Sequence, residues 1–319
     1  MRKIDEVLAG NRSAAILGHI HPDGDCVGSC LGLYHYIKKA APQMEADVYL
    51  EPFRKEFFLL PGAGDVHHDF QTEKIYDLCI VCDASDRGRL GAGAAILDRA
   101  RVTVCVDHHK TNPGFTQITV LCPETGSTSE ILFELMEESL IGRETAVCLY
   151  TGMAHDTGVF KYQSTTSRTM EIAGKLMDKG VPFTEIIDQT FYQKSFSQTR
   201  IMGKVLLDSQ LCADGQCIYS SVSLAEMEAL GATPMDLEGI VEQMRLVDGV
   251  EVSLFLYETA PGIFKASMRS KSRADVSRAA ARFGGGGHAR AAGCSLTGDR
   301  EGVLAAMLSC VKEELAAHD

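Results

Sequence analysis

Short apolar runs alternate with segments of helical character up to Pro182. The runs are AAIL, ADVYL, LCIVC and VTVCV, and helix-like segments cover residues 27–40 and 92–99. Three of these runs, AAIL, LCIVC and VTVCV, consist of β-branched and apolar residues, as expected for strands buried on both faces of a parallel sheet. A Ser127-x-x-Glu130 capping box then opens further helices, which include residues 144–154 and 167–179. The alternation predicts βαβ units and an α/β fold with a mostly parallel sheet.

The second part of the chain has a different pattern. Asp214-Gly215 lies between two apolar runs, which is typical of a β-hairpin. The strands VEVSLFLYE and IFKASMRS follow, then a helix near residues 275–282, a run of four glycines, a strand AAGCSL and a closing helix at 300–317. We therefore predict a larger domain at residues 1–187, a helical linker at 188–208 and a smaller α+β domain at 209–319.

Acidic and imidazole side chains come directly after three of the predicted buried strands. Because parallel strands end at one edge of a sheet, residues far apart in the sequence can meet there. Pro22 and Gly24 force a turn that brings two aspartates together. Carboxylates this close repel each other unless cations lie between them, and a mixed Asp and His set suits Mn²⁺-like or Mg²⁺-like ions. The residues expected to converge are His19, Asp23, Asp25, Asp83, His108 and Asp156.

Five motifs follow one another along the chain. They are GHIHPDGD at 18–25, VCDASDRGRLG at 81–91, VDHHKTN at 106–112, AHDTGVF at 154–160 and FGGGGHARAAG at 283–293. In this order they resemble the DHH phosphoesterase superfamily, and nearly the whole chain resembles its NrnA-type branch. The resemblance implies a phosphoesterase with an N-terminal DHH domain, a C-terminal DHH-associated substrate domain and an active site in the cleft between them.

The same resemblance implies roles for individual residues. The six converging side chains would hold two divalent ions, expected to be Mn²⁺, with Asp83 as the bridge. Asp107 would support the site, and His109 would face the scissile phosphate. Glycines let a backbone approach a phosphate closely, and imidazole and guanidinium groups add charge-assisted bonds. The substrate-binding residues are expected to be Gly285, Gly286, Gly287, His288, Arg269 and, as a weaker candidate, Arg245.

Charge narrows the class of substrate. The chain has 31 basic and 43 acidic side chains, for a net charge of −12. This disfavours long nucleic acid, because phosphate neutralisation supplies most non-specific affinity. The resemblance implies short oligonucleotides and adenine nucleotides instead. Hydrolysis would convert nanoRNA, pApA or cyclic di-AMP to mononucleotides and pAp to AMP, with the order of preference left open.

Composition also bears on the cellular setting. No apolar stretch approaches the roughly 18 residues that span a bilayer, and eleven cysteines are scattered through apolar runs. These features predict a cytoplasmic protein with reduced core thiols and no membrane association. The oligomeric state is left open, with a homodimer as one alternative.

Three other functions compete with this interpretation. A manganese inorganic pyrophosphatase shares the N-terminal motifs but has a different C-terminal domain, without GGGGHARAAG. A RecJ-like exonuclease normally has a longer chain and a basic DNA path. A non-catalytic nucleotide sensor could keep the glycine loop and lose the metals, although every expected ligand type is present here. Within the second motif we expect Arg89 to be a structural ion-pair partner rather than a catalytic residue.

Overall fold

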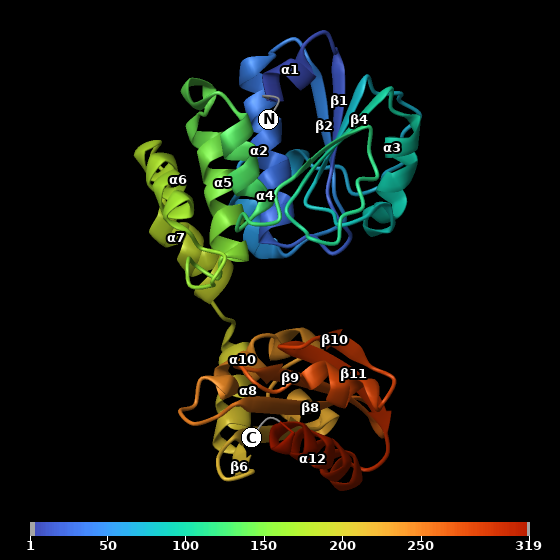
Figure 1. The fold of residues 1–319 in the computed structure, drawn as a ribbon, viewed down its shortest axis with the longest axis vertical. Helices are drawn as coiled ribbons and strands as arrows, with labels where there is room; N and C mark the ends of the chain where they lie inside the picture. Colours follow the sequence, from blue (N-terminus) through green and yellow to red (C-terminus); the bar gives the residue numbers. More distant parts are fainter. Residues whose placement is uncertain (1–3, 318–319) are drawn as a thin grey trace. The chain divides into compact units, whose positions relative to one another are not determined.

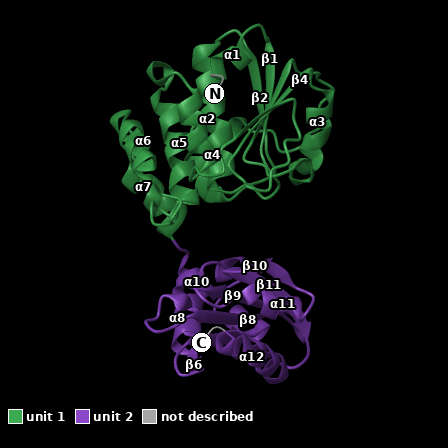
Figure 2. Ribbon diagram, viewed as in Figure 1, with its two compact units in different colours: residues 1–193 green, residues 194–319 purple. Residues whose placement is uncertain are grey.

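The computed structural model describes residues 4–317, which belong to two compact units, Met1–Gln193 and Lys194–Asp319 (Figure 2). The outermost residues of the two predicted domains, 1–3 and 318–319, lie outside the described part. The predicted linker at 188–208 is divided between the units. A π-helical turn, η5 (Asp188–Tyr192), ends the first unit. Helix α8 (Phe196–Leu207) belongs to the second, because its Ile201 and Val205 are fully buried in that unit's core.

The first unit is built on a five-stranded sheet in the order β2-β1-β3-β4-β5, in which every pairing is parallel (Figure 1). The α/β fold class predicted from the sequence is confirmed. The strands are β1 (Ser13–Leu17), β2 (Glu45–Tyr49), β3 (Leu78–Cys82), β4 (Val102–Asp107) and β5 (Ile118–Leu121). The α-helices are α1 (Ile4–Leu8), α2 (Gly24–Ala40), α3 (Ala94–Arg99), α4 (Thr128–Leu135), α5 (Arg143–Asp156), α6 (Ser167–Asp178) and α7 (Phe183–Ile187). Short 3₁₀ turns are η1 (Lys55–Leu59), η2 (Ala63–Asp65), η3 (Arg87–Gly93) and η4 (Glu138–Leu140).

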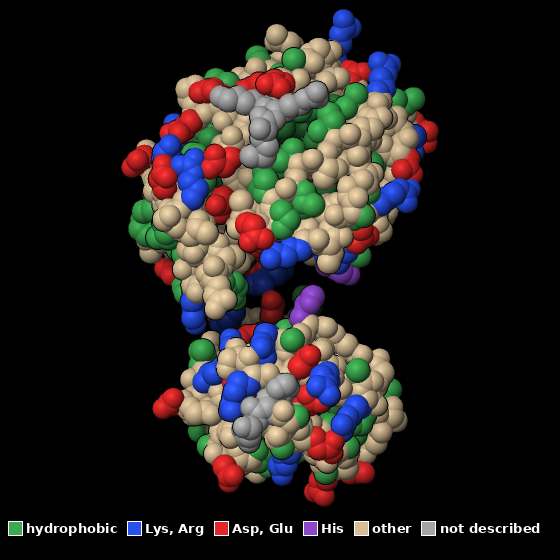
Figure 3. All heavy atoms as spheres, in the orientation of Figure 1, with side chains coloured by type: hydrophobic (Ala, Val, Ile, Leu, Met, Phe, Trp, Pro, Cys, Tyr) green, Lys and Arg blue, Asp and Glu red, His purple; other side chains and the backbone are tan. Residues whose placement is uncertain are grey.

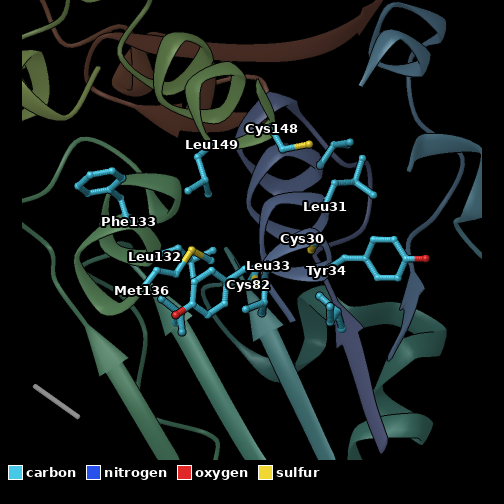
Figure 4. Close-up of a cluster of buried hydrophobic side chains, with 14 of the residues drawn as sticks. Cys30, Leu31, Leu33, Tyr34, Cys82, Leu132, Phe133, Met136, Cys148 and Leu149 are labelled. Carbon is cyan, nitrogen blue, oxygen red and sulfur yellow. The ribbon is translucent and has the colours of Figure 1, made fainter. Parts of the chain in front are cut away.

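Helices cover both faces of this sheet. Helices α2, α4 and α5 bury apolar side chains against one face, and α3 packs on the other (Figure 1). Figure 4 shows side chains of the three helices gathered over the sheet, among them Leu33, Leu132 and Leu149. Cys79 and Cys82 belong to cores on opposite faces of β3, because alternate strand residues point to opposite sides. Although Cys79 and Cys82 have the CxxC spacing of many metal and redox sites, their thiols therefore do not form a pair.

The structure departs from the sequence analysis at two places in the first unit. Strand β5 was not anticipated, because its four residues are all only half-buried and the apolar alternation is short. The Ser127–Glu130 capping box is only half formed. Ser127 accepts a hydrogen bond from the Glu130 amide, but the Glu130 carboxylate accepts from Gly126 N and Thr169 Oγ1 instead of returning to Ser127. A tertiary contact with α6 thus replaces the local one.

The second unit is a six-stranded mixed sheet in the order β10-β11-β9-β8-β7-β6. Only the β7–β8 pairing is parallel. Its strands are β6 (Gln210–Cys212), β7 (Cys217–Val222), β8 (Val252–Ala260), β9 (Ile263–Ser270), β10 (Gly286–His288) and β11 (Ala291–Thr297). Besides α8, its helices are α9 (Leu224–Ala229), η6 (Pro234–Leu237), α10 (Ile240–Arg245), α11 (Val276–Ala281) and α12 (Arg300–Ala316). The α+β class is confirmed, and the predicted hairpin at Asp214-Gly215 joins β6 to β7.

The two faces of this second sheet are covered unequally. Helices α11 and α12 pack on one face, whereas α8, α9 and α10 pack on the other face over β7 and β8. On that second face the strands β9, β11 and β10 carry half-buried or exposed residues that, apart from Ile263, are small or polar. The sheet therefore presents an open polar surface beside α10. None of the helices within residues 4–317 combines the length and the hydropathy that a bilayer crossing requires.

Candidate metal centre

The polar motifs of the first unit meet at the carboxyl edge of its sheet. Strands β1, β3 and β4 are neighbours with β3 in the middle. His19 follows β1, Asp83 follows β3 and His108 follows β4. The chain turns from β1 to one side of the sheet and from β3 to the other. This switch in direction leaves a crevice at the strand ends, the usual place for a ligand in an open α/β sheet.

Asp83 lies at the centre of the site. Its Oδ2 is 3.6 Å from His19 Nε2 and its Oδ1 is 3.5 Å from His108 Nε2. The residue is 2% exposed and has a φ of 59°, and its amide donates to the Val106 carbonyl oxygen at 3.0 Å. A non-glycine residue with left-handed backbone costs about 1–3 kcal/mol, and such strain is concentrated at functional sites. The strain is consistent with a position selected for its side chain.

Asp23 has two tasks at the start of α2. Its Oδ1 caps the helix by accepting from the amides of Asp25 and Cys26, both at 3.1 Å. Its Oδ2 lies 3.6 Å from His19 Nε2. The helix therefore begins at Gly24, three residues earlier than the sequence pattern indicated. The cap fixes the carboxylate that faces His19.

Asp25 and Asp156 join the site from α2 and α5. Asp25 is fully buried, and its Oδ2 accepts from Thr128 N at 2.6 Å. Its Oδ1 accepts from Ser129 N at 3.1 Å and from Ser129 Oγ at 2.6 Å. The first turn of α4 thus fixes this carboxylate, as expected for an anion at a helix N-terminus. Asp156 ends α5 with its Oδ2 3.0 Å from His108 Nε2.

These side chains form three overlapping groups. Within each group the potential ligand atoms lie within 4.8 Å of one another. All six residues expected from the sequence are brought together, and His109 joins one group. The oxygen and imidazole donors fit a divalent cation such as Mn²⁺ or Mg²⁺. The groups are His19, Asp23 and Asp83; Asp25, His108 and Asp156; and Asp83, His108 and His109.

Protonation reflects the excess of negative charge. Burial opposes a charge on His19, but the carboxylates of Asp23 and Asp83 outweigh it and raise the pKa of His19 to about 12. Burial likewise opposes a charge on His108, while Asp156, Asp25 and Asp83 raise its pKa to about 10. Burial and the charges of Asp83 and Asp156 raise the pKa of Asp25 well above its usual value. Divalent cations would supply the positive charge that these carboxylates favour.

Asp107 and His109 form a hydrogen-bonded pair beside these groups. Asp107 is fully buried, and its Oδ1 lies 2.7 Å from His109 Nδ1. Asn112 Nδ2 donates to the other Asp107 oxygen at 2.7 Å. Burial opposes a charge on Asp107, but the bonds from His109 and Asn112 outweigh it and lower the pKa of the carboxyl. His109 is 41% exposed, so its Nε2 is the ring nitrogen left for a ligand at the surface.

The two other histidines of these motifs do not join the site. His21 is 87% exposed and lies near Glu51. His155 bonds to Thr190 Oγ1 through its Nε2 at 2.8 Å and packs edge-on against Phe57 and Phe191. Burial lowers the pKa of His155 to about 4, which keeps the ring neutral. His155 therefore has a packing role.

The predicted substrate residues of the second unit share one face of its sheet. His288 on β10 lies opposite Ala291 on β11, and Ala291 lies opposite Arg269 on β9. Residues directly opposite each other point to the same face, so the imidazole and the guanidinium flank a single small side chain. This row lies on the open polar surface beside α10.

Arg269 and Arg245 are both paired with one carboxylate. Arg269 Nε donates to Glu242 Oε1 at 2.5 Å, and Arg245 donates to Glu242 Oε2 through Nε and Nη2. Arg269 Nη1 also donates to the Met268 carbonyl oxygen at 3.0 Å. A phosphate that binds Arg269 must therefore accept from the guanidinium N–H groups that remain free, or displace the Glu242 carboxylate from the arginine.

The glycines of FGGGGHARAAG serve different purposes. A Cβ on Gly285 would lie 2.3 Å from the Gly293 carbonyl oxygen, and one on Gly287 would lie 2.4 Å from that of Ala291. These two glycines let the backbone approach β11 closely, and the second half of the glycine run, Gly286 and Gly287, belongs to strand β10. Gly286 has open space at its Cβ position. Of the three glycines predicted to bind substrate, Gly286 has the backbone most open to a ligand.

Comparison with known proteins agrees with the motifs. Residues 13–153 match the DHH family, N-terminal domain, and residues 214–317 match the DHHA1 domain. The chain is 31% identical to the bifunctional oligoribonuclease and PAP phosphatase NrnA of Thermus thermophilus, over 99% of this chain and 94% of that protein. The chain belongs to the DHH family.

Two further similarities place this DHH-family chain among its relatives. A solved structure, an exopolyphosphatase-related protein from Bacteroides fragilis, is 28% identical, with a TM-score of 0.88 over 97% of this chain and 94% of that one. The cyclic-di-AMP phosphodiesterase PdeA of Listeria monocytogenes is 25% identical over 89% of this chain, which spans 45% of that protein. The family predicted from the five motifs is confirmed.

The sequence did not reveal the residues that orient the ligands of this DHH-family site. Thr128 Oγ1 donates to Asp83 Oδ1 at 3.1 Å, and Ser129 holds Asp25. Partners of this kind fix the orientation of ligands that bind a metal. The Ser127-x-x-Glu130 pattern located the start of α4, but it carried no sign that the helix faces a carboxylate about a hundred residues earlier. Asn112, which holds Asp107, ends the VDHHKTN motif, but the motif alone did not indicate this role.

Proposed function

We propose that this protein is a two-metal-dependent phosphoesterase, a hydrolase that converts short nucleotide substrates to mononucleotides and pAp to AMP. The convergence of His19, Asp23, Asp25, His108 and Asp156 on the buried Asp83 carries the proposal. The similarity to relatives named for oligoribonuclease, PAP phosphatase and cyclic-di-AMP phosphodiesterase activity supports it. The DHHA1 match favours this function over a pyrophosphatase.

Two of the residue groups would hold the two ions, for which we propose Mn²⁺. The group of His19, Asp23 and Asp83 would bind the first, and the group of Asp25, His108 and Asp156 would bind the second together with Asp83. Bound there, the ions would activate water and offset the negative charge that develops on the phosphate. Thr128 and Ser129 keep the carboxylates in place. Every ligand except Asp23 is at least partly withdrawn from solvent, which strengthens its interaction with a cation.

His109 is proposed as the residue that donates a proton to the leaving oxygen. Its Nδ1 is bonded to Asp107, which is itself held by Asn112. This relay fixes the ring, and burial of the Asp107 charge favours the protonated imidazole. The Asp107 bond raises the pKa of His109, which favours the protonated ring that a proton donor requires.

The second unit is proposed to hold the substrate through Arg269, Gly286 and His288. A guanidinium and an imidazole on one open sheet face suit a phosphate, and the bare backbone of Gly286 suits a base or sugar. On the face seen in Figure 3, acidic and basic side chains are interspersed over both units. With the net charge of −12, this pattern favours short anionic ligands over long nucleic acid.

The proposed activity predicts length selection. With Mn²⁺, the protein should release AMP from pApA and cleave RNA of about two to five nucleotides faster than a long single strand, because its net charge of −12 disfavours a long polyanion. Rates should fall only shallowly with salt, because few phosphates are neutralised. The measurement is a comparison of initial rates on pAp, pApA, cyclic di-AMP, short RNA and long RNA, with EDTA as the control.

Equal rates on pApA and a long strand would contradict the selection. Binding of these nucleotides without any hydrolysis would instead favour the sensor. Release of phosphate from pyrophosphate alone would favour the pyrophosphatase. The oligomeric state stays open, and the native mass of the same preparation distinguishes a monomer from a homodimer. The eleven free cysteines support the proposed cytoplasmic location.

A second prediction separates substrate binding from metal binding. His288→Ala should leave the Mn²⁺ content intact and raise KM for pApA by about tenfold or more, because one bond to a charged group is lost. Asp156→Ala should lower Mn²⁺ occupancy and kcat together. Metal analysis and steady-state kinetics on both variants make the comparison. If His288→Ala removes metal, or leaves both kinetic constants unchanged, the assigned division of roles is wrong.

A further inference from the structure

Two arginines in the turn η3 have different surroundings. Arg87 forms a salt bridge with Asp98. Arg89 is half-buried, and within residues 4–317 no ion pair joins it to a carboxylate. The expectation that Arg89 is a structural ion-pair partner was therefore wrong. The nearby Asp86 is already engaged, because its carboxylate caps η3 and accepts from Arg89 N and Ser85 Oγ.

The guanidinium of Arg89 lies against the metal centre. Its Nη2 is 3.2 Å from His19 Nδ1. That nitrogen is also 2.8 Å from the Ile20 carbonyl oxygen, which can only accept a hydrogen bond. Nδ1 therefore carries the proton and leaves Nε2 toward Asp23 and Asp83. An N–H group cannot accept a bond from a guanidinium, so Arg89 keeps its donors for another acceptor.

The position of Arg89 is fixed by its backbone. Its carbonyl oxygen accepts from Ile20 N at 2.7 Å, which ties η3 to the loop after β1. Gly91 has a φ of 52°, and a Cβ there would lie 2.7 Å from Ile20 Cγ2. These contacts join the second motif to the first. A half-buried cation without a carboxylate partner is thus held beside the His19, Asp23 and Asp83 group.

We propose that Arg89 binds the reacting phosphate of the substrate through its non-bridging oxygens. This inference rests on the proposed phosphoesterase function. Four carboxylates lie in the metal groups, and two divalent ions would balance their charge. A terminal phosphate brings further negative charge, for which Arg89 is the adjacent cation. Its planar fork matches two phosphate oxygens, which a lysine ammonium does not.

The test uses the full-length protein loaded with Mn²⁺ and three variants, Arg89→Gln, Arg89→Lys and the matched control Arg87→Gln. The readouts are Mn²⁺ content, the Kd for AMP by calorimetry, and kcat and KM on pApA. Arg89→Gln should weaken AMP binding and raise KM by about 10- to 100-fold with unchanged Mn²⁺ content. Arg89→Lys should be intermediate, and Arg87→Gln should match the wild type.

Two results would overturn the inference. AMP binding that is unchanged in Arg89→Gln, or absent in the wild type, excludes a phosphate contact. Loss of Mn²⁺ in Arg89→Gln shows that Arg89 acts by positioning His19. If Arg89→Gln does not fold, the comparison of Arg89→Lys with the wild type decides in the same way. A wild type that binds AMP but hydrolyses no substrate refutes the proposed function, while the AMP affinities still test Arg89.

Discussion

Asp83→Asn is expected to remove both metal ions and to reduce kcat/KM on pApA by on the order of a thousandfold. Among the described residues, Asp83 is the one whose carboxylate pairs with both the His19 and the His108 imidazole, so its loss affects both metal groups. Asparagine preserves the shape but not the charge. The measurement is Mn²⁺ content per chain combined with steady-state kinetics.

The same substitution should lower the Tm of the metal-free protein. In EDTA the Asp83 carboxylate pairs with the His19 and His108 imidazoles, whose pKa values it helps to raise, and removing one partner of a buried ion pair is destabilising. Asp98→Asn is a suitable control, because Asp98 forms an exposed ion pair with Arg87 that contributes little. Full turnover by Asp83→Asn, or two retained ions, would exclude Asp83 as the bridge.

Gly152→Ala should damage the metal centre without changing any ligand. A Cβ at Gly152 would lie 2.0 Å from Ser129 Oγ and 2.5 Å from Asp25 Oδ1. The added methyl group must displace one of these groups, which costs about 1–3 kcal/mol of stability. Because Ser129 orients Asp25, Mn²⁺ affinity should fall by about 10- to 100-fold. Chemical denaturation and Mn²⁺ titration measure the two effects.

Gly174→Ala provides the matched control in another helix. Gly174 lies within α6, and no atom lies within 4 Å of a Cβ built on it. This substitution should stabilise the protein by about 0.4–1 kcal/mol, because alanine restricts the unfolded chain. It should leave Mn²⁺ affinity unchanged. Wild-type Mn²⁺ affinity in Gly152→Ala would refute the importance of this close contact.

The close approach of α2 and α5 explains why glycines occur here. A Cβ at Gly28 would lie 2.5 Å from the Cys148 carbonyl oxygen, and one at Gly24 would lie 2.2 Å from the His155 ring. With Gly152, these positions let the two helices approach until Asp25 and Asp156 face the same space. Sequence patterns alone did not indicate this close approach of α2 and α5, because a glycine inside a helix can equally be a site of low helix propensity.

The sequence by itself determined the fold class and which residues could meet at the site. Continuous apolar runs predict buried parallel strands, and parallel strands end at one edge. The positions of His19, Asp83 and His108 after three such runs were therefore sufficient to expect their convergence. Asp23 and Asp25 followed from the turn at Pro22 and Gly24.

Tertiary structure alone decided which partners orient these residues and which cations remain free. Thr128 and Ser129 reach Asp25 across about a hundred residues, and Arg269 is paired with Glu242 whereas Arg89 has no carboxylate partner among the described residues. Periodicity and motif spacing report local conformation and burial. They do not report which side chain of one helix faces a given side chain of another, because that depends on packing distances between elements that are remote in the sequence.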